Sequence, residues 1–246
     1  MAASRFPNKP MAKINGMPMI GHVYHRARMC KYLSDVYVAT CDEEIIDYIT
    51  FLGGKAVLTK NTHETAADRT AEAFEIIASS KLINYNSVLM IQGDEPLLNP
   101  IVLDEMIEFH NNKASGTITN LISEINDIDE FNDPNVVKAV KDKAGRILYF
   151  SRSPIPYNFK FNDRISMWKQ LGLILFNKDA LEIFVKFDFS ELEKVESVDM
   201  NRALENNITI NAYPVSEVSH AVDIPEDILI VQELIEKDIL TKSYLN

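Results

Sequence analysis

The sequence predicts an α/β fold with a mostly parallel sheet, helices on both faces and an antiparallel excursion. In the first half of the chain, short apolar runs alternate with longer amphipathic runs. Because the short runs are apolar throughout, we expect strands that are covered on both faces. Strands that alternate with helices in this way form doubly wound sheets.

The first half can be divided into successive elements. The run VYVAT at 36–40 is β-branched and aromatic, which is typical of a buried strand. Gly53-Gly54 ends the helix that follows it, and Pro100 begins a later helix at the position where proline is tolerated. The predicted strands are 36–40, 55–59 and 87–92, and the predicted helices are 42–52, 67–80 and 100–111.

After Gly116 the pattern changes, because strands follow one another through short loops. We expect region 117–185 to form an antiparallel excursion or a dimerisation arm inside a single domain of residues 1–246. The predicted strands are 117–123, 136–142, 147–150, 169–176 and 209–215, and the predicted helices are 177–186, 198–206 and 225–240.

Composition excludes several classes of protein. The 246 residues include 25 basic and 36 acidic ones, a net charge of −11, which disfavours binding to a nucleic-acid backbone. Cys30 and Cys41 form neither a disulfide framework nor a Cys-His metal motif, so we expect a reduced cytoplasmic compartment. No apolar run approaches the ~18 residues that span a bilayer. Phosphate-binding P-loop, dinucleotide-binding and hydrolase nucleophile motifs are all missing from the sequence.

Asp94 follows the apolar strand at 87–92 directly, within Gln92-Gly93-Asp94-Glu95-Pro96. In open α/β sheets, ligands bind at the carboxyl ends of strands. A carboxylate there suits Mg²⁺, which prefers oxygen ligands and often shares them with substrate phosphates. The alternative is an ordinary aspartate in a turn before a helix.

Asp223 lies before the last predicted helix, next to Pro225. It is a candidate for a second metal ligand. Aspartate before a helix-starting proline is also a common N-cap, and from the residues alone the cap is the better interpretation.

Two proline-bounded loops carry candidate cations. Arg5 and Lys9 lie four residues apart near the N-terminus and suit a triphosphate, although a frayed basic tail has the same pattern. Arg152 follows a predicted strand and precedes Pro154 and Pro156. Its guanidinium suits a substrate carboxylate, while the alternative is a surface arginine packed over a neighbouring aromatic ring.

Six segments, taken in order, resemble the CMP-Kdo synthetases, the 3-deoxy-manno-octulosonate cytidylyltransferases. They are SRFPNKPMAKINGMPMIGHVYHRA (4–27), VYVATCDEEI (36–45), IQGDEPLL (91–98), FNDPNVVKAV (131–140), GRILYFSRSPIP (145–156) and VDIPEDI (222–228). The resemblance implies a nucleotide-diphospho-sugar transferase-like fold, usually a homodimer. It also implies an enzyme of lipopolysaccharide sugar activation that uses Mg²⁺, joins CMP from CTP to an acidic sugar and releases pyrophosphate.

The resemblance also assigns roles residue by residue. It implies that Lys9, Asp94 and Arg152 are catalytic. The residues that it places at the nucleotide are Arg5, Lys9, Asp68, Arg69 and Gln92. It makes Asp94 and Asp223 the metal ligands, and Arg152, Gln170 and Glu196 the residues on the acceptor side.

The chain departs from the family pattern mainly on the acceptor side. Gln170 replaces a family histidine, and Asp199 and Met200 replace two positions of a Glu-rich helix. On the nucleotide side, Asn8 stands for a glycine and 65–67 read Thr-Ala-Ala for Ser-Gly-Thr. The acceptor is therefore open between 3-deoxy-manno-octulosonate, an amino-substituted octulosonate and a nonulosonic acid. A different class of function, a non-catalytic nucleotide-sugar-binding protein, is also open.

In the resembled family a strand ending in Ala-Arg comes immediately before the segment that begins here at Met1. We therefore expect a central strand to be missing from this chain. The expected consequence is an empty place in the sheet beside the strands at 36–40 and 87–92.

Overall fold

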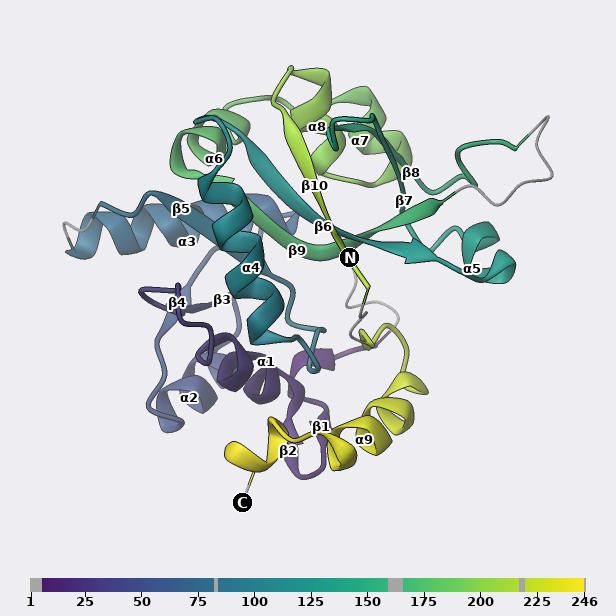
Figure 1. Ribbon diagram of the computed structural model, residues 1–246. Coiled ribbons are helices and arrows are strands. Elements are labelled where there is room, and N and C mark those ends of the chain that lie inside the picture. The colour runs from purple at the N-terminus through teal and green to yellow at the C-terminus, as the bar shows by residue number, and fades with distance from the viewer. Residues whose placement is uncertain (1–5, 82–83, 159–165, 217–219, 246) are drawn as a thin grey trace. The chain divides into compact units, whose positions relative to one another are not determined.

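The computed structural model describes residues 6–81, 84–158, 166–216 and 220–245 (Figure 1). The chain forms two compact units, each assembled from separated segments. The first unit comprises 1–83, 91–105 and 219–246, and the second comprises 84–90 and 106–218. The prediction that 1–246 act as a single domain stays a prediction.

The first unit is built from short strands and the helices that pack on them. Its helical elements are η2 (Lys9–Met11), α1 (Met19–Ala27), α2 (Glu43–Phe51), α3 (Ala66–Lys81), α9 (Asp227–Lys237) and η3 (Thr241–Ser243). Strands β1 (Lys13–Ile14) and β2 (Met17–Pro18) form a hairpin, and β3 (Val38–Thr40) pairs in parallel with β4 (Ala56–Leu58). The hairpin turns at Asn15-Gly16, where both residues have positive φ, as its tight turn requires.

Two hydrophobic clusters hold the first unit together. One joins Ile20 and Tyr24 of α1 to Ile45 and Ile49 of α2. Gly54 lies against this cluster, where a Cβ atom would approach the Tyr24 ring to 2.7 Å, so a side chain at this position would collide with the core. The other cluster joins β1 and the start of α1 to α9, through Ile14, Met19, Val222, Val231 and Ile235.

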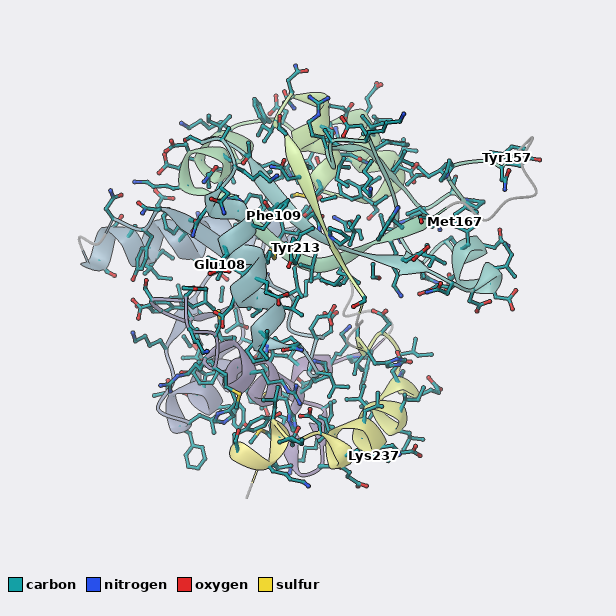
Figure 2. All side chains as sticks on the ribbon, viewed as in Figure 1. Glu108, Phe109, Tyr157, Met167, Tyr213 and Lys237 are labelled. Carbon is teal, nitrogen blue, oxygen red and sulfur yellow. The ribbon has the colours of Figure 1, made fainter. Side chains whose placement is uncertain are left out.

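The second unit contains a mixed six-stranded sheet with the order β10-β6-β9-β7-β8 and with β5 paired to β9. Its strands, side by side in Figure 1, are β5 (Ser87–Ile91), β6 (Ile118–Ile125), β7 (Lys138–Lys141), β8 (Ile147–Ser151), β9 (Met167–Asn177) and β10 (Ile210–Val215). The helices are α4 (Pro100–Asn111), which begins in the first unit, α5 (Ile128–Asn132), α6 (Lys178–Phe184), α7 (Glu191–Glu196) and α8 (Met200–Glu205). Phe109 of α4 packs on Tyr213 of β10, with ring centroids 5.1 Å apart (Figure 2).

The predicted α/β class is confirmed, and the predicted elements match the observed ones to within a few residues. The pairing is more mixed than the sequence indicated. β10–β6 and β3–β4 are parallel, whereas β6–β9, β7–β9 and β7–β8 are antiparallel. Loops too short for a crossover helix join β7 to β8, which allows only antiparallel neighbours.

In the described part of the chain, β3 pairs with β4 and β5 pairs with β9, in separate sheets. The missing central strand stays a prediction. None of the described helices combines the length and the apolar character that crossing a membrane requires.

His110 of α4 provides a test of this core. It is buried, its Nδ1 bonds the Thr119 hydroxyl at 2.8 Å, and burial lowers its pKa to about 4. Between pH 6.5 and 4 the unfolded chain binds a proton that the folded chain excludes, so the free energy of unfolding falls as pH falls. His110→Asn cannot titrate. Between pH 6.5 and 4 we expect the free energy of unfolding to fall by up to about 3 kcal/mol less in the variant than in the wild type. Urea unfolding at each pH measures this difference. Equal pH slopes would contradict the assignment.

Candidate functional site

A buried ammonium lies at the centre of the first unit's candidate site. Lys9 is only 8% exposed, and Asn8, with a positive φ, turns the chain just before it. The Lys9 Nζ donates to Asp94 Oδ2 at 2.8 Å and to the Val222 carbonyl at 2.6 Å, and it lies 3.8 Å from Asp223 Oδ1. The structure thus brings together three sequence-predicted residues from three distant segments.

Asp94 occupies the loop between β5 and α4. Its backbone carbonyl accepts a hydrogen bond from Val222 N at 2.9 Å, so backbone and side chain both tie this loop to the segment before α9. Gly93 precedes it, where a Cβ atom would lie 3.3 Å from Ile20 Cδ1. The side chain of Asp94 is 17% exposed, which leaves it partly open to a ligand.

Asp223 is not the N-cap of α9. The helix begins at Asp227, and the Asp227 carboxylate accepts hydrogen bonds from the backbone N–H groups of Asp223 and Ile224, at 2.7 and 2.9 Å. The side chain of Asp223 is 77% exposed. The cap interpretation is therefore wrong, because the N-cap residue of α9 is Glu226 and the carboxylate that accepts hydrogen bonds in this turn is that of Asp227.

The donor set at Lys9 fits a divalent cation that is shared with a substrate. Asp94 and Asp223 both lie within 4 Å of one ammonium, so their oxygens are close enough to face a common charge. Mg²⁺ typically takes one or two carboxylates and completes its shell with phosphate oxygens and water. Among the described residues no group of three His, Cys, Asp or Glu side chains is placed to hold a metal ion.

Asp68 and Arg69 lie in the first turn of α3. The Thr65 hydroxyl accepts from Asp68 N at 3.1 Å and donates to Asp68 Oδ2 at 2.7 Å, so this departure from the family pattern caps the helix. Arg69 Nη1 donates to Thr59 Oγ1 at 2.6 Å and to the Lys60 carbonyl at 3.1 Å. Both side chains are thereby fixed within the 59–69 loop.

Glu72 organises the same loop from inside α3. Its Oε2 accepts from Lys60 N at 2.9 Å and bonds His63 Nε2. The bond with His63 is the main reason why the pKa of Glu72 lies below its usual value. The sequence analysis missed Glu72, although its helical spacing from Asp68 placed it on the same side of α3.

The two remaining nucleotide-side candidates add less. Gln92 is exposed, two residues before Asp94. Arg5 lies outside the described residues.

In the second unit, Arg152 and Glu196 form one cluster. The Glu196 carboxylate accepts from Ser151 Oγ at 2.6 Å, from Arg152 N at 2.8 Å and from Tyr149 OH at 3.0 Å. Burial opposes ionisation, but these hydrogen bonds outweigh it and lower the pKa of Glu196. The predicted acceptor-side carboxylate therefore holds the end of β8, which carries Arg152.

The guanidinium of Arg152 bonds carbonyl oxygens rather than a carboxylate. Its Nε donates to Glu196 O at 2.6 Å, Nη1 to Pro134 O at 2.9 Å and Nη2 to Ser197 O at 3.2 Å. Because carbonyls carry no formal charge, the positive charge of the guanidinium is not neutralised by these bonds. Tyr157, in the loop that follows, is 81% exposed (Figure 2).

Lys138 is a second cation of this cluster that sequence reasoning missed. It is fully buried and donates to Asp133 O at 2.8 Å and Val136 O at 2.6 Å, on either side of the Pro134 carbonyl that supports Arg152. Burial lowers its pKa, and so does the nearby charge of Arg152. A lysine inside the apolar run VVKAV was the available signal, since lysine is rarely buried without a purpose.

Gln170 is oriented by Asn120, a second missed residue. Asn120 Nδ2 donates to the Leu171 and Leu173 carbonyls, at 3.0 and 3.4 Å, so its Oδ1 must face the other way. Gln170 Nε2 donates to that Oδ1 at 2.7 Å. Arg152 and Glu196 bond each other, whereas Gln170 bonds Asn120, so among these described residues the structure brings together two of the three acceptor-side candidates.

Comparison with known proteins gives one consistent family. The family described as cytidylyltransferase matches residues 1–210. The chain is 37% identical to the 3-deoxy-manno-octulosonate cytidylyltransferase of Thermodesulfovibrio yellowstonii, over 94% of this chain and 93% of the relative. It is also 37% identical to the 8-amino-3,8-dideoxy-manno-octulosonate cytidylyltransferase of Shewanella pealeana, over 96% of this chain and 95% of the relative.

A solved structure agrees with these relatives. CMP:2-keto-3-deoxy-manno-octonic acid synthetase, solved in complex with CTP, superposes with a TM-score of 0.86 and 31% identity. The match covers 95% of this chain and 94% of the solved chain. Asp94 and Asp223 lie in two loops and share one buried lysine, Lys9. Together with this agreement in sequence and fold, the site shows that the chain belongs to the cytidylyltransferase family.

Proposed function

We propose that this protein transfers CMP from CTP to 3-deoxy-manno-octulosonate or a closely related 3-deoxy-2-keto sugar acid. In the reaction, the anomeric hydroxyl of the sugar loses its proton to water, and its oxygen forms a bond to the α-phosphorus of CTP. The bond from that phosphorus to the bridging oxygen breaks, and pyrophosphate leaves. The observation that carries this proposal is the Lys9 ammonium between the carboxylates of Asp94 and Asp223, in a chain of this family.

The first unit would bind the nucleotide. Lys9 holds Asp94 and Asp223 near each other, although two carboxylates alone would repel. Asp94 and Asp223 would hold a divalent cation, Mg²⁺ in our proposal, which when bound would supply charge neutralisation for the phosphates and a lower pKa for the attacking hydroxyl. Lys9 and Arg5 supply positive charge toward the triphosphate, and the loop of Asp68 and Arg69 lines the nucleotide. Local cations of this kind let a chain of net charge −11 bind an anion.

The second unit would bind the acceptor. Arg152 and the buried Lys138 carry two positive charges, and the carboxylates of Asp133 and Glu196 lie close enough to act on Lys138. The guanidinium of Arg152, whose own hydrogen bonds go to uncharged carbonyls, suits the carboxylate of a sugar acid. Glu196 acts by holding the backbone of Arg152, and Gln170 supplies a fixed amide.

The relatives leave the acceptor open between a hydroxyl and an amino group at carbon 8. One alternative is a cytidylyltransferase that uses a nonulosonic acid as its acceptor. The other is a protein that binds nucleotide sugars without catalysing the transfer. We also propose a homodimer that uses region 117–185.

The assay that tests the function measures pyrophosphate release from CTP and Mg²⁺ with each acceptor in turn. We expect release with 3-deoxy-manno-octulosonate or its 8-amino analogue, and little with UTP or GTP in place of CTP. Turnover only with a nonulosonic acid would move the protein to that alternative. Binding of CTP without release with any acceptor would identify a non-catalytic homologue.

Asp94→Asn and Asp223→Asn should each reduce kcat by on the order of 10²-fold or more, because each removes a charge that holds the metal. Asp47→Asn, an exposed position on α2, is the matched control and should keep wild-type turnover. Circular dichroism checks that each variant folds. Wild-type rates in both site variants would show that the metal assignment is wrong.

Arg152→Lys should raise the KM for the acceptor about tenfold or more and leave the KM for CTP nearly unchanged. A lysine keeps the charge, but it lacks the planar set of N–H donors that lets arginine bond three protein carbonyls and the carboxylate of the acceptor at once. Arg146→Lys, in an exposed ion pair with Asp142, is the control. A variant with weakened CTP use and normal acceptor use would place Arg152 on the nucleotide side instead.

A further inference from the structure

We propose that the C-terminal segment Asp238–Tyr244 positions the loop that carries Asp94, with Arg26 as the connecting residue. The proposal rests on the proposed function only in taking Asp94 as part of the catalytic site. All the contacts involved lie within the first unit. Residues 238–244 lie beyond the 1–210 that match the family.

Arg26 is the hub of this arrangement. It lies in α1, is 1% exposed, and its guanidinium bonds two segments that are far apart in the sequence. Nη1 donates to the Leu98 carbonyl at 3.2 Å. Nη2 pairs with Asp238 and donates to Thr241 Oγ1 at 2.9 Å, and Nε donates to Tyr244 OH at 3.2 Å. A buried guanidinium with fixed partners on one side presents a fixed donor on the other.

The partners on the C-terminal side fix one another. Thr241 N and Thr241 Oγ1 both donate to Asp238 Oδ2, at 2.8 and 2.9 Å. Burial alone would raise the pKa of Asp238, but these bonds and the Arg26 charge keep it below its usual value. Asp238 is therefore ionised and forms a stable ion pair with Arg26. The turn at 238–241 cannot shift without breaking several hydrogen bonds.

Tyr244 and His22 set the direction of a hydrogen-bond chain. His22 Nε2 faces the Ile14 carbonyl at 2.9 Å, and a carbonyl only accepts, so this nitrogen carries the hydrogen. Burial lowers the pKa of His22, which keeps the ring neutral and leaves Nδ1 as an acceptor. The Tyr244 hydroxyl, 3.0 Å away, donates to Nδ1 and accepts from Arg26. The Tyr244 ring also stacks on His25, with centroids 5.0 Å apart.

Through Leu98, Arg26 connects these hydrogen bonds to the loop that carries Asp94. Leu98 is fully buried, and its N–H donates to Glu95 O at 3.1 Å in the turn that directly follows Asp94. The loop is thus anchored at two points, by Lys9 and Val222 at Asp94 and by Arg26 at Leu98. Misplacement of a catalytic group by about 1 Å can cost up to about 10²-fold in rate, so loss of one anchor should reduce turnover.

The test combines Tyr244→Phe with hydrogen–deuterium exchange. The variant removes the hydroxyl and keeps the ring that stacks on His25. We expect faster exchange in the peptide that covers 92–99, a kcat reduced about tenfold, and an unchanged acceptor KM. Tyr32→Phe, at an exposed tyrosine in the same unit, is the control and should change neither quantity.

Thr241 supplies a second pair of variants in case Tyr244→Phe unfolds the protein. Thr241→Val removes the hydroxyl that accepts from Arg26, and Thr241→Ser restores it. Valine should reproduce the exchange and rate effects, and serine should rescue both. Unchanged exchange at 92–99 in the folded variants would overturn the proposal. If wild type releases no pyrophosphate, the proposed function fails, but the exchange measurement still decides whether this segment positions the loop.

Discussion

The Lys9 ammonium is the interaction on which the candidate site depends. Its two short hydrogen bonds join the N-terminal loop to residues 85 and 213 positions away in the sequence. A buried charge that loses its partner typically costs about 3–5 kcal/mol, so these bonds strongly favour one arrangement of the three segments. The same ammonium keeps the Asp94 and Asp223 carboxylates close together. One interaction therefore both stabilises the first unit and assembles its functional groups.

The two units surround the cations of their candidate sites in different ways. In the first unit, the one Lys9 ammonium faces two carboxylates, which leaves one negative charge, and Arg26 is matched by Asp238. In the second unit, Arg152 and Lys138 bond backbone carbonyls, which satisfy their hydrogen bonds but not their charge. The first arrangement suits a cation that accompanies phosphates, and the second suits an anionic sugar. An acidic protein can in this way present positive charge where it is needed.

The spacing of apolar residues, together with the glycines and prolines at element boundaries, predicted most of the fold. Runs such as 36–40 and 87–92, and boundaries such as Pro100, are local signals, and the observed β3, β5 and α4 follow them closely. The short elements α5 and α7 and the hairpin β1–β2 were missed, because two to six residues are too few to establish a period. The Asn15-Gly16 turn was a readable signal for the hairpin. The mixed pairing depends on contacts between distant strands.

The sequence by itself determined the order of elements, the loops that carry Lys9, Asp94, Asp223 and Arg152, and the family that these loops resemble, because all of these depend on residues close together in the chain. Only the tertiary structure decided their partners. It paired Lys9 with two carboxylates, made the Asp227 carboxylate the acceptor in the turn before α9, and showed Lys138, Asn120 and Arg26 as supporting residues. The bonds of Lys138 and Asp227 are local, but their roles depend on burial and turn geometry, whereas Lys9, Asn120 and Arg26 bond partners tens to hundreds of residues away, which no local pattern records.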